Sequence, residues 1–309
     1  MAMDFSLQGL LDPQSCYDFL LDVLHPQGLQ CPNGHEFERS RVRHTRRAPI
    51  VGYECGVCGQ RFNIFTRTTL QGIRYSAEKT LQLVRGFAQG ETTARLAREI
   101  QGCRKNVLKW RHKLQQLALD ALPRKPLSDK VVEADEMYQN AGEKGERHDD
   151  PKDPPRRRAN KRRGHGTWDN DRPPILGIAG RTGGKVRMEA CHRSTRDELV
   201  PHVLSNTEAG AVVNTDEWQA YSSLRELDRG HSTVCHAKRE WARDDDGDGI
   251  REVHCNTAEG IWTGLRNFLR RFRGVHKEYL SQYVAMFEWA HNEKVASCGF
   301  LRALLNVTG

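Results

Sequence analysis

The sequence Val131-Val132-Glu133-Ala134-Asp135-Glu136 decides the fold of this chain, together with the run Ala211-Val212-Val213-Asn214-Thr215-Asp216. Each run begins with two or three apolar residues and ends at or near an acid. Such runs predict buried strands of a central sheet, and the carboxyl ends of strands are where α/β sheets place their functional sites. We therefore expect Asp135 and Asp216 to end two strands and to come together at one edge of the sheet.

A third acid, Glu259, lies on a predicted helix from Asn256 to Arg273. One side of this helix is apolar at helical spacing, with Ile261, Trp262, Leu265, Phe268, Leu269 and Phe272. The opposite side carries Glu259 followed by Arg266, Arg270 and Arg273. Asn256 precedes Glu259 by one turn, so we expect it to share or support metal binding. Three carboxylates from distant segments are what a two-metal phosphoryl-transfer site needs, and their oxygens suit Mg²⁺ or Mn²⁺.

Two pairs of zinc ligands are predicted near the amino terminus. Cys55 and Cys58 form a Cys-x-x-Cys-Gly knuckle, which brings two thiolates onto one tetrahedral zinc. Cys31 and His35 form the other pair, because Gly34 stands where a second cysteine is expected. The spacing predicts a zinc ribbon, in which His44 is the alternative to His35 as the fourth ligand.

Two short helical patterns flank Gln101-Gly102-Cys103. Thr92 or Thr93 is expected to cap the first helix, and Arg104 begins the second. The second helix turns Val107, Trp110 and Leu114 inward, and its outward face is basic, with Lys105, Lys109, His112 and Lys113. This arrangement predicts a DNA-binding helix-turn-helix, although a plain helical hairpin gives the same pattern.

The patterns divide the chain into three expected parts. An amino-terminal helix and zinc ribbon occupy residues 1–75, a helix-turn-helix DNA-binding region occupies 76–122, and a catalytic domain occupies 127–295. Within the catalytic domain, residues 139–174 are charged, rich in Pro and Gly and almost free of aliphatic side chains, which predicts a flexible basic insertion.

The order of elements after this insertion defines the expected fold class. Strands are predicted at Ile175–Ala179 and Lys185–Ala190, then a helix from Thr195 to about Ser205, the Asp216 strand, and a helix over Trp218–Leu227. This α/β order is compatible with a ribonuclease H-like sheet.

The composition favours a polyanionic partner. The formal net charge is +8 and the pI is about 9.1. Basic residues cluster at Arg156–Arg158 and Lys161–Arg163, and such clusters bind phosphates with a steep salt dependence. Nine cysteines without a signal peptide, and no apolar run of membrane length, indicate a reducing, cytoplasmic location. The acidic run from Asp244 to Gly249 opens like a calcium loop but lacks the closing Glu, so we expect a solvated loop.

The order of these motifs resembles the zinc-ribbon DDE transposases of small prokaryotic insertion sequences, the ISXO2-like transposase family. The resemblance runs from about Cys16 to Asn292 and rests mainly on Asn-Thr-Asp-Glu-Trp-Gln-Ala-Tyr (214–221) and on the segment 254–262. It implies a ribonuclease H-like catalytic domain in which Asp135 and Asp216 are catalytic, with either Asn256 or Glu259 as the third residue. Seven positions after Glu259 the family usually has Lys, whereas this chain has Arg266.

The resemblance also implies the activity, cofactors and partners. A DDE transposase binds the ends of its element and catalyses metal-dependent DNA strand cleavage and transfer. Asp135, Asp216 and Glu259 would hold Mg²⁺ or Mn²⁺, and a structural zinc would lie in the ribbon. The expected partners are the terminal inverted repeats, the target DNA and further copies of the chain, in a nucleoid-associated prokaryotic protein. The alternatives are an inactive or domesticated transposase that acts as a DNA-binding regulator, and a metal-dependent nuclease.

Overall fold

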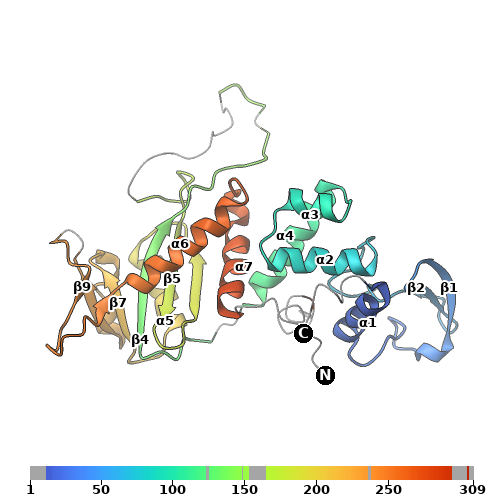
Figure 1. Cartoon of the computed structure of the whole chain (residues 1–309), viewed down its shortest axis with the longest axis horizontal. Helices are drawn as coiled ribbons and strands as arrows, with labels where there is room; N and C mark the ends of the chain where they lie inside the picture. The colour runs from blue at the N-terminus through green and yellow to red at the C-terminus, as the bar shows by residue number, and fades with distance from the viewer. Residues whose placement is uncertain are drawn as a thin grey trace. The chain divides into compact units, whose positions relative to one another are not determined.

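The computed structural model describes residues 12–122, 125–147, 149–152, 165–235, 238–293 and 305. The chain forms two compact units: an amino-terminal unit of Met1–Ala121 with Glu293–Gly309, and a sheet unit of Leu122–Asn292. Figure 1 shows the elements of both units along the chain. None of the helices in the described ranges combines the length and the apolar character needed to cross a membrane.

The amino-terminal unit begins with a helix and a small sheet. Asp12 caps α1 (Pro13–Leu24) by accepting a 2.7 Å hydrogen bond from the Ser15 N–H. Cys16, Phe19, Leu20 and Val23 recur at helical spacing and form its buried side. The 3₁₀-helix η2 (Phe37–Arg39) then leads into an antiparallel sheet in the order β1-β2-β3, formed by β1 (Ser40–Arg47), β2 (Ile50–Cys55) and β3 (Arg61–Phe62).

Three helices complete the described part of this unit: α2 (Ala77–Ala88), α3 (Thr93–Glu99) and α4 (Arg104–Asp120). Thr92 caps α3 by accepting a hydrogen bond from the Arg95 N–H, and α4 begins at Arg104, so both helix predictions are confirmed. Arg111 of α4 is fully buried, with its Nε 2.9 Å from Thr93 Oγ1 and its guanidinium over the Phe87 ring. This charged side chain therefore joins α4 to both preceding helices.

The sheet unit is built on five strands in the order β6-β5-β4-β7-β8. The strands are β4 (Val131–Tyr138), β5 (Pro174–Gly180), β6 (Val186–Ala190), β7 (Val212–Asp216) and β8 (Gly230–Val234). β4, β5 and β6 are antiparallel neighbours, whereas β7 is parallel to β4 and β8 is parallel to β7. This is the strand order of the ribonuclease H-like fold, and the predicted fold class is confirmed.

Helices cover both faces of this sheet. On one face, α5 (Arg196–Asn206) packs on alternate residues of the central strands, including Val132, Ala134 and Val213. On the other face lie α6 (Asn256–Arg270) and α7 (Leu280–Glu293), whose Leu265 and Val284 share a core with Met137. Because strand side chains alternate between faces, Glu133, Asp135 and Met137 all point toward the α6 side.

The structure corrects the prediction that Asp135 ends its strand. Pairing of β4 with β7 stops at Glu133 and Asn214, but pairing of β4 with β5 continues to Tyr138 and Pro174. The antiparallel neighbour thus extends the strand beyond the acid. Asp216, in contrast, is the last residue of β7, as predicted.

The structure also differs from the prediction at two helices: one is replaced by 3₁₀-helices, and the other ends earlier. The segment 218–227 forms two 3₁₀-helices, η3 (Gln219–Tyr221) and η4 (Leu224–Leu227), because Asp216 Oδ1 accepts the Trp218 N–H and Asp228 turns the chain with a φ of 55°. α6 ends at Arg270, three residues before the predicted end, and Lys144 Nζ binds the carbonyl oxygens of residues 272–274.

The remaining elements join or flank the sheet. A two-stranded ribbon of β9 (Ala242–Arg243) and β10 (Val253–His254) leads into α6, and η6 (Lys277–Tyr279) precedes α7. The described residues at both ends of the predicted insertion pair with each other, since the Ala141 N–H donates to the Asp171 carbonyl oxygen at 3.0 Å. The basic clusters Arg156–Arg158 and Lys161–Arg163 lie outside the described residues.

Candidate active site and zinc-binding cluster

The sheet register places Asp135 and Asp216 level with each other. Glu133 and Asn214 are direct partners across the parallel pair of β4 and β7. Asp135 and Asp216 each follow by two residues, so they lie one pleat further along neighbouring strands and on the same face. Two acids that are 81 positions apart in the printed sequence are thereby brought to one place on the sheet.

The carboxylate of Asp135 is held by two hydrogen bonds. Trp262 Nε1 donates to its Oδ2 at 2.7 Å, and the Glu136 N–H donates to its Oδ1 at 2.8 Å. Burial raises the pKa of Asp135, and the charges of Asp216 and Glu259 raise this pKa further. Asp135 is therefore a buried acid with further negative charges nearby, which is a situation that a divalent cation relieves.

Glu259 lies in the first turn of α6, on its exposed side. Asn256, the alternative third residue, is the first residue of the same helix and is also exposed. Both residues therefore lie in the first turn of the helix whose Trp262 binds Asp135, and both stay candidates for the third position.

Trp262 reaches Asp135 because the sheet offers it room at Gly177. Gly177 is the direct partner of Asp135 across β4 and β5, and a Cβ at this glycine would lie only 2.4 Å from the Trp262 ring. The indole is 3% exposed. The sequence placed Trp262 on the apolar side of the helix, but its N–H donor to the acid was not anticipated.

Glu136 belongs to the same stretch but points to the opposite face of the sheet. Its carboxyl accepts a hydrogen bond from the Tyr221 hydroxyl. Burial raises the pKa of Glu136 well above its ordinary value, and the charges of Asp135 and Asp216 raise it further. Glu136 is therefore tied to Tyr221 on the face of the sheet opposite Asp135.

The three acids supply only oxygen donors, which fit Mg²⁺ or Mn²⁺ better than a thiophilic metal. Among the described residues, their ligand atoms do not form a group within 4.8 Å. No Lys or Arg side chain in that part of the chain forms an ion pair with Asp135, Asp216 or Glu259. The donor chemistry and the accumulated negative charge thus fit divalent cations.

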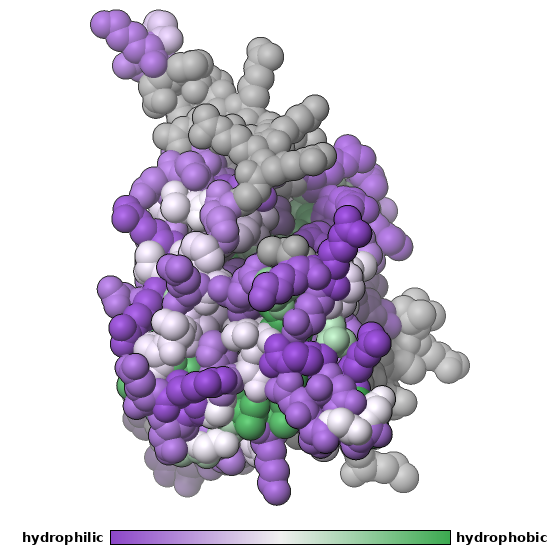
Figure 2. All heavy atoms as spheres, turned by 90° about the vertical axis from the view of Figure 1, so that its left-hand side faces the viewer, coloured by the Kyte–Doolittle hydropathy of each residue, from purple (hydrophilic) through white to green (hydrophobic). Residues whose placement is uncertain are grey.

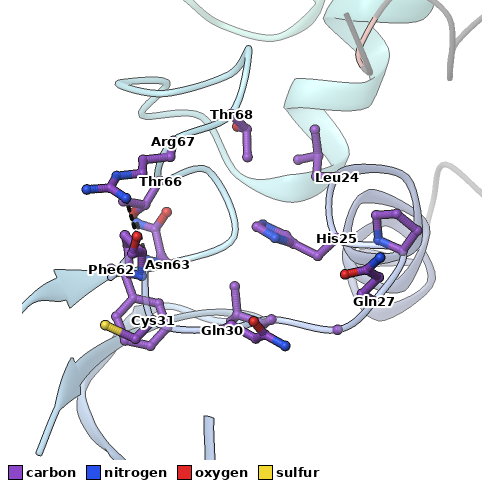
Figure 3. Close-up of a pocket in the computed structure, with 14 residues that line it drawn as sticks. Leu24, His25, Gln27, Gln30, Cys31, Phe62, Asn63, Thr66, Arg67 and Thr68 are labelled. Carbon is purple, nitrogen blue, oxygen red and sulfur yellow. Dashed lines mark hydrogen bonds between the residues drawn. The ribbon is translucent and has the colours of Figure 1, made fainter. Parts of the chain in front are cut away.

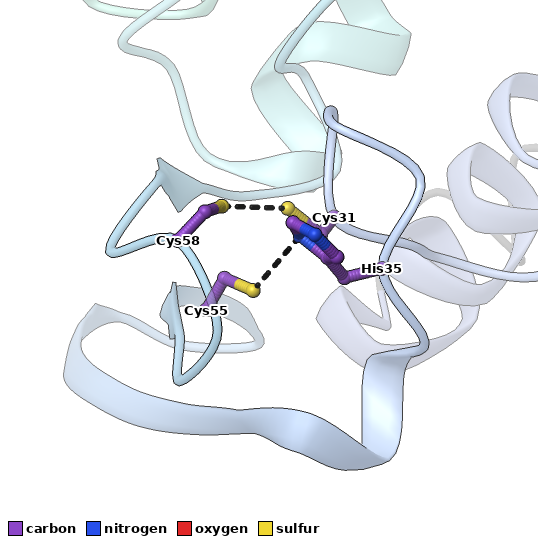
Figure 4. Close-up of side chains that lie close together, drawn as sticks. All are labelled: Cys31, His35, Cys55 and Cys58. Carbon is purple, nitrogen blue, oxygen red and sulfur yellow. Dashed lines mark hydrogen bonds between the residues drawn. The ribbon is translucent and has the colours of Figure 1, made fainter.

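The predicted zinc ligands Cys31, His35, Cys55 and Cys58 come together in the amino-terminal unit. Their ligand atoms all lie within 4.8 Å of one another. The Sγ atoms of Cys31 and Cys58 are 3.6 Å apart, and Cys55 Sγ lies 3.6 Å from His35 Nδ1 (Figure 4). With a Zn–S bond of about 2.3 Å, tetrahedral geometry separates two sulfurs by about 3.8 Å, so the four groups fit one zinc ion.

His44 is not in this group, because its ring covers Gly52 on the neighbouring strand. The arrangement of the donors therefore favours His35 as the fourth ligand. A hydrogen bond from the Gln60 N–H lowers the pKa of Cys58 to about 6, whereas burial raises the pKa of Cys31. Of these two cysteines, Cys58 is accordingly the one that ionises more readily.

A cavity of about 380 Å³ opens beside the zinc cluster, lined in part by His25, Cys31 and Arg67 (Figure 3). At one edge of it, the Arg67 guanidinium donates to the Pro32 carbonyl oxygen and to Asn33 Oδ1. Asn33 Nδ2 in turn lies 3.5 Å from Cys58 Sγ. Arg67 thus supports the loop that carries the first pair of zinc ligands.

The outward face of α4 is basic, as predicted. Lys105, Lys109 and Lys113 are exposed and His112 is half-buried, whereas Val107 and Leu114 are buried. Trp110 is half-buried, and Lys113 Nζ lies 5.0 Å from the centre of its ring. Burial and the charge of Lys109 lower the pKa of Lys113, so like charges are gathered on this face. In the sheet unit, Arg266, Arg270 and Arg273 are exposed on and just after α6.

The surface around β9 is largely hydrophilic (Figure 2). There the loop between β9 and β10 groups the carboxylates of Asp244, Asp246 and Glu252 within 4.8 Å. The Asp244 carboxylate accepts the N–H groups of Gly247 and Gly249. These bonds close the loop on itself without a contribution from Cys255.

The family model of the ISXO2-like transposase domain matches residues 126–292 of this chain, which is more than half of it. A protein of Halobacterium salinarum, described as an uncharacterized protein in transposable element ISH50, is 29% identical over 273 residues, which cover 88% of each chain. The domain match includes the whole sheet of the second unit and all three predicted acids.

Two solved structures show weaker similarity. The magnesium complex of the HTLV-2 integrase catalytic core domain is 12% identical over 54% of this chain and 87% of that chain, with a TM-score of 0.30. The pre-cleavage Mos1 transpososome is 13% identical over 74% of this chain and 80% of that chain, with a TM-score of 0.22. Both TM-scores are too low to carry an argument, so the fold assignment depends on the strand order and the family match.

Proposed function

The chain belongs to the ISXO2-like transposase family, and on that premise we propose that it binds the ends of its own insertion sequence and transfers them to new DNA. Transposase membership makes DNA cleavage and transfer the kind of chemistry expected of the sheet unit. The observation that carries the proposal is the register of the sheet, which brings Asp135 and Asp216 level on the neighbouring strands β4 and β7. The helix α6, which carries Glu259, is tied to the same place by the bond from Trp262 to Asp135.

In the proposed mechanism, the three carboxylates would hold divalent metal, which would supply activation of the attacking oxygen and stabilisation of the leaving oxygen. Asp135 is oriented by the Trp262 N–H, and Asp216 is oriented by the Trp218 N–H at 2.9 Å. Glu259 approaches from the first turn of α6. Hydrolysis at the element end would release a 3′-hydroxyl. This hydroxyl would then attack a target phosphate in line, and the bond from that phosphorus to the target 3′-oxygen would break, which leaves a 3′-hydroxyl on the target strand.

We assign DNA recognition to the amino-terminal unit. The basic face of α4 fits the phosphate backbone of the terminal inverted repeats, and the zinc cluster would stabilise the small sheet beside it. In the sheet unit, Arg266, Arg270 and Arg273 would grip phosphates. Because two ends must be paired in one reaction, we expect a homo-oligomer.

The proposal is tested with purified protein and labelled DNA that carries the gene's own flanking repeats. The change is Asp216→Ala, and Glu217→Ala is the matched control because Glu217 is the exposed neighbouring acid. We expect cleavage in Mg²⁺ by the wild type and by the control, and a loss of about 10³-fold or more in Asp216→Ala, a typical penalty for removing a group that acts in the transition state.

End binding is measured on the same proteins by gel shift. If Asp216→Ala cleaves as well as the wild type, the assigned site is wrong. If the wild type binds the ends but never cleaves them in Mg²⁺ or Mn²⁺, the chain acts as a DNA-binding regulator. Cleavage without any joined product would identify a nuclease.

A further inference from the structure

Glu133 is a charged residue with no exposed surface, one pleat below Asp135 on the same face of the sheet. Its carboxylate accepts hydrogen bonds from Thr257 Oγ1 at 2.9 Å and from the Ala258 N–H at 3.0 Å. His254 Nδ1 lies 3.1 Å from the same carboxylate. All three partners belong to the segment that ends β10 and begins α6.

The Glu133 carboxylate therefore serves as the anchor of the α6 amino terminus. The first N–H groups of a helix have no partner within the helix, and a negative charge is favourable beside them. Glu133 supplies both an acceptor and a charge to the first turn. That turn carries Glu259, one residue after Ala258.

Arg181 completes this anchor from the end of β5. Its Nε donates to Glu133 Oε1 at 2.9 Å, and its terminal nitrogens donate to the carbonyl oxygens of Glu252 and His254. Asn214, the direct sheet partner of Glu133, donates to the Glu252 carbonyl oxygen at 3.4 Å. Groups from β4, the end of β5 and β7 thus hold one short segment, residues 252–258.

We propose that Glu133 is a positioning residue: through the first turn of α6 it sets where Glu259 stands relative to Asp135 and Asp216. The inference rests on the proposed function, because it treats these three acids as the metal-binding group. In the described part of the chain, the Glu133 carboxylate is bound by the protein donors Arg181, Thr257 and Ala258, with His254 beside it. Its replacement should move Glu259 without removing any acid of the site.

The test compares Glu133→Gln with Glu288→Gln in the full-length protein. Glu288 is a matched control, since it is also buried, accepts a backbone N–H (Met188, 2.8 Å) and pairs with an arginine (Arg187, 3.4 Å). Glu288, however, joins α7 to β6. Within the described residues, its hydrogen bonds and its ion pair do not involve the segment 252–258. Thr257→Val is a milder second variant, which removes one donor to Glu133 and leaves the Arg181 pair intact.

Two readouts are used: amide hydrogen exchange of residues 252–262, and the Mn²⁺ concentration for half-saturation of the protein. In Glu133→Gln we expect exchange in the first turn of α6 to be faster by roughly tenfold or more, because a charge-assisted acceptor is lost. The Mn²⁺ half-saturation concentration should rise by roughly 10- to 100-fold, as when a group that orients a metal ligand is removed. Thr257→Val should shift both values in the same direction by less, and Glu288→Gln should shift neither.

The proposal is overturned if Mn²⁺ binding by Glu133→Gln equals that of the wild type. It is also overturned if exchange accelerates across the whole sheet unit to the same degree as around α6, because the role is then only structural. These readouts do not need activity. If the wild type binds Mn²⁺ but fails to cleave element ends, the proposed function fails while the positioning role of Glu133 is still decided.

Discussion

The orientation of the Asp135 carboxylate depends on a glycine in the neighbouring strand. Gly177 lies opposite Asp135 and leaves room for the Trp262 indole, which donates a hydrogen bond to the acid. A methyl group at Gly177 would meet the ring at 2.4 Å, so the indole has to move. The orientation of the acid is therefore coupled to close packing between β5 and α6.

We predict that Gly177→Ala destabilises the sheet unit by about 1–3 kcal/mol through overpacking, and lowers cleavage as well because Asp135 loses its indole donor. Urea unfolding followed by Trp fluorescence measures the first effect. Gly260→Ala on α6 is the control, since a Cβ there meets nothing within 4 Å. The control should gain about 0.5–1 kcal/mol from helix propensity. Equal stability of Gly177→Ala and wild type would contradict the packing argument.

Glu288 gives the sheet unit a pH dependence. Burial raises the pKa of this carboxyl to about 7 in spite of the hydrogen bond from Met188 and the charge of Arg187. The folded state therefore holds the proton more tightly than the unfolded state, whose pKa is near the ordinary value for Glu. This contribution to stability is complete below the unfolded pKa and is lost as the pH rises through about 7.

We predict that, between pH 4.5 and 8, the free energy of unfolding of the wild type falls relative to that of Glu288→Gln by about 2–3 kcal/mol. Urea titrations of both proteins across this pH range measure the difference. The comparison cancels the titration of all other groups. A difference that is independent of pH, or that grows in favour of the wild type as the pH rises, would show that Glu288 is ionised throughout.

At the scale of elements, the small sheet β1-β2-β3 lies next to the cysteine cluster, and Cys55 is itself the last residue of β2. Only a few apolar side chains, among them Cys31, Cys55 and Phe62, form the core there. So small a core needs an additional stabilising cross-link, and a zinc ion is the cross-link that these four donors fit.

We predict one zinc ion per chain, and loss of this zinc in Cys58→Ser. The amino-terminal sheet should then unfold with little change in the sheet unit, because metal binding and folding are coupled in such small modules. Metal analysis and hydrogen exchange over residues 31–62 measure this. Cys103→Ser is the control, since Cys103 is exposed and outside the cluster. A Cys58→Ser protein that retains a full equivalent of zinc would point to a different ligand set.

The elements that the sequence predicted are those with a strong local pattern. β5, β7 and α6 follow from apolar runs and from apolar residues at helical spacing. β8 was not predicted, because Gly230-His231-Ser232-Thr233-Val234 is a mostly polar, half-buried edge strand whose only apolar residue is Val234. The 3₁₀-helices after β7 were predicted as one helix, because the tertiary bonds of Asp216 do not show in a local pattern.

For the candidate site, too, residues with a local sequence pattern could be predicted and residues that depend on tertiary contacts could not. Asp135, Asp216 and Glu259 were identified because acids after apolar runs, or on the polar side of a helix, are visible in sequence. The anchor of Glu133 was not, since its partners Arg181 and Thr257 lie 48 and 124 positions away. Contacts of this kind depend on the strand order, which no short window of sequence contains.

For the whole molecule, family membership and chemistry point in the same direction. The match over residues 126–292 covers the sheet unit from residue 126 onward, in which the register of β4 and β7 brings Asp135 and Asp216 level. The amino-terminal unit has a Cys/His cluster whose donors fit a zinc ion and a basic helix face, which are features expected of a DNA-binding part. Both units are needed if recognition of the ends and chemistry at the ends occur in one reaction.

The most direct test of the central claim is a mobility assay in cells, with a marker placed between the gene's own flanking sequences and the new junctions sequenced. With the wild type we expect the marker to be joined to new target sites at the element ends, and with Asp216→Ala we expect no junctions while end binding persists. Junctions that form equally with both proteins would contradict the account, because strand transfer would then not depend on the acids brought together by β4, β7 and α6.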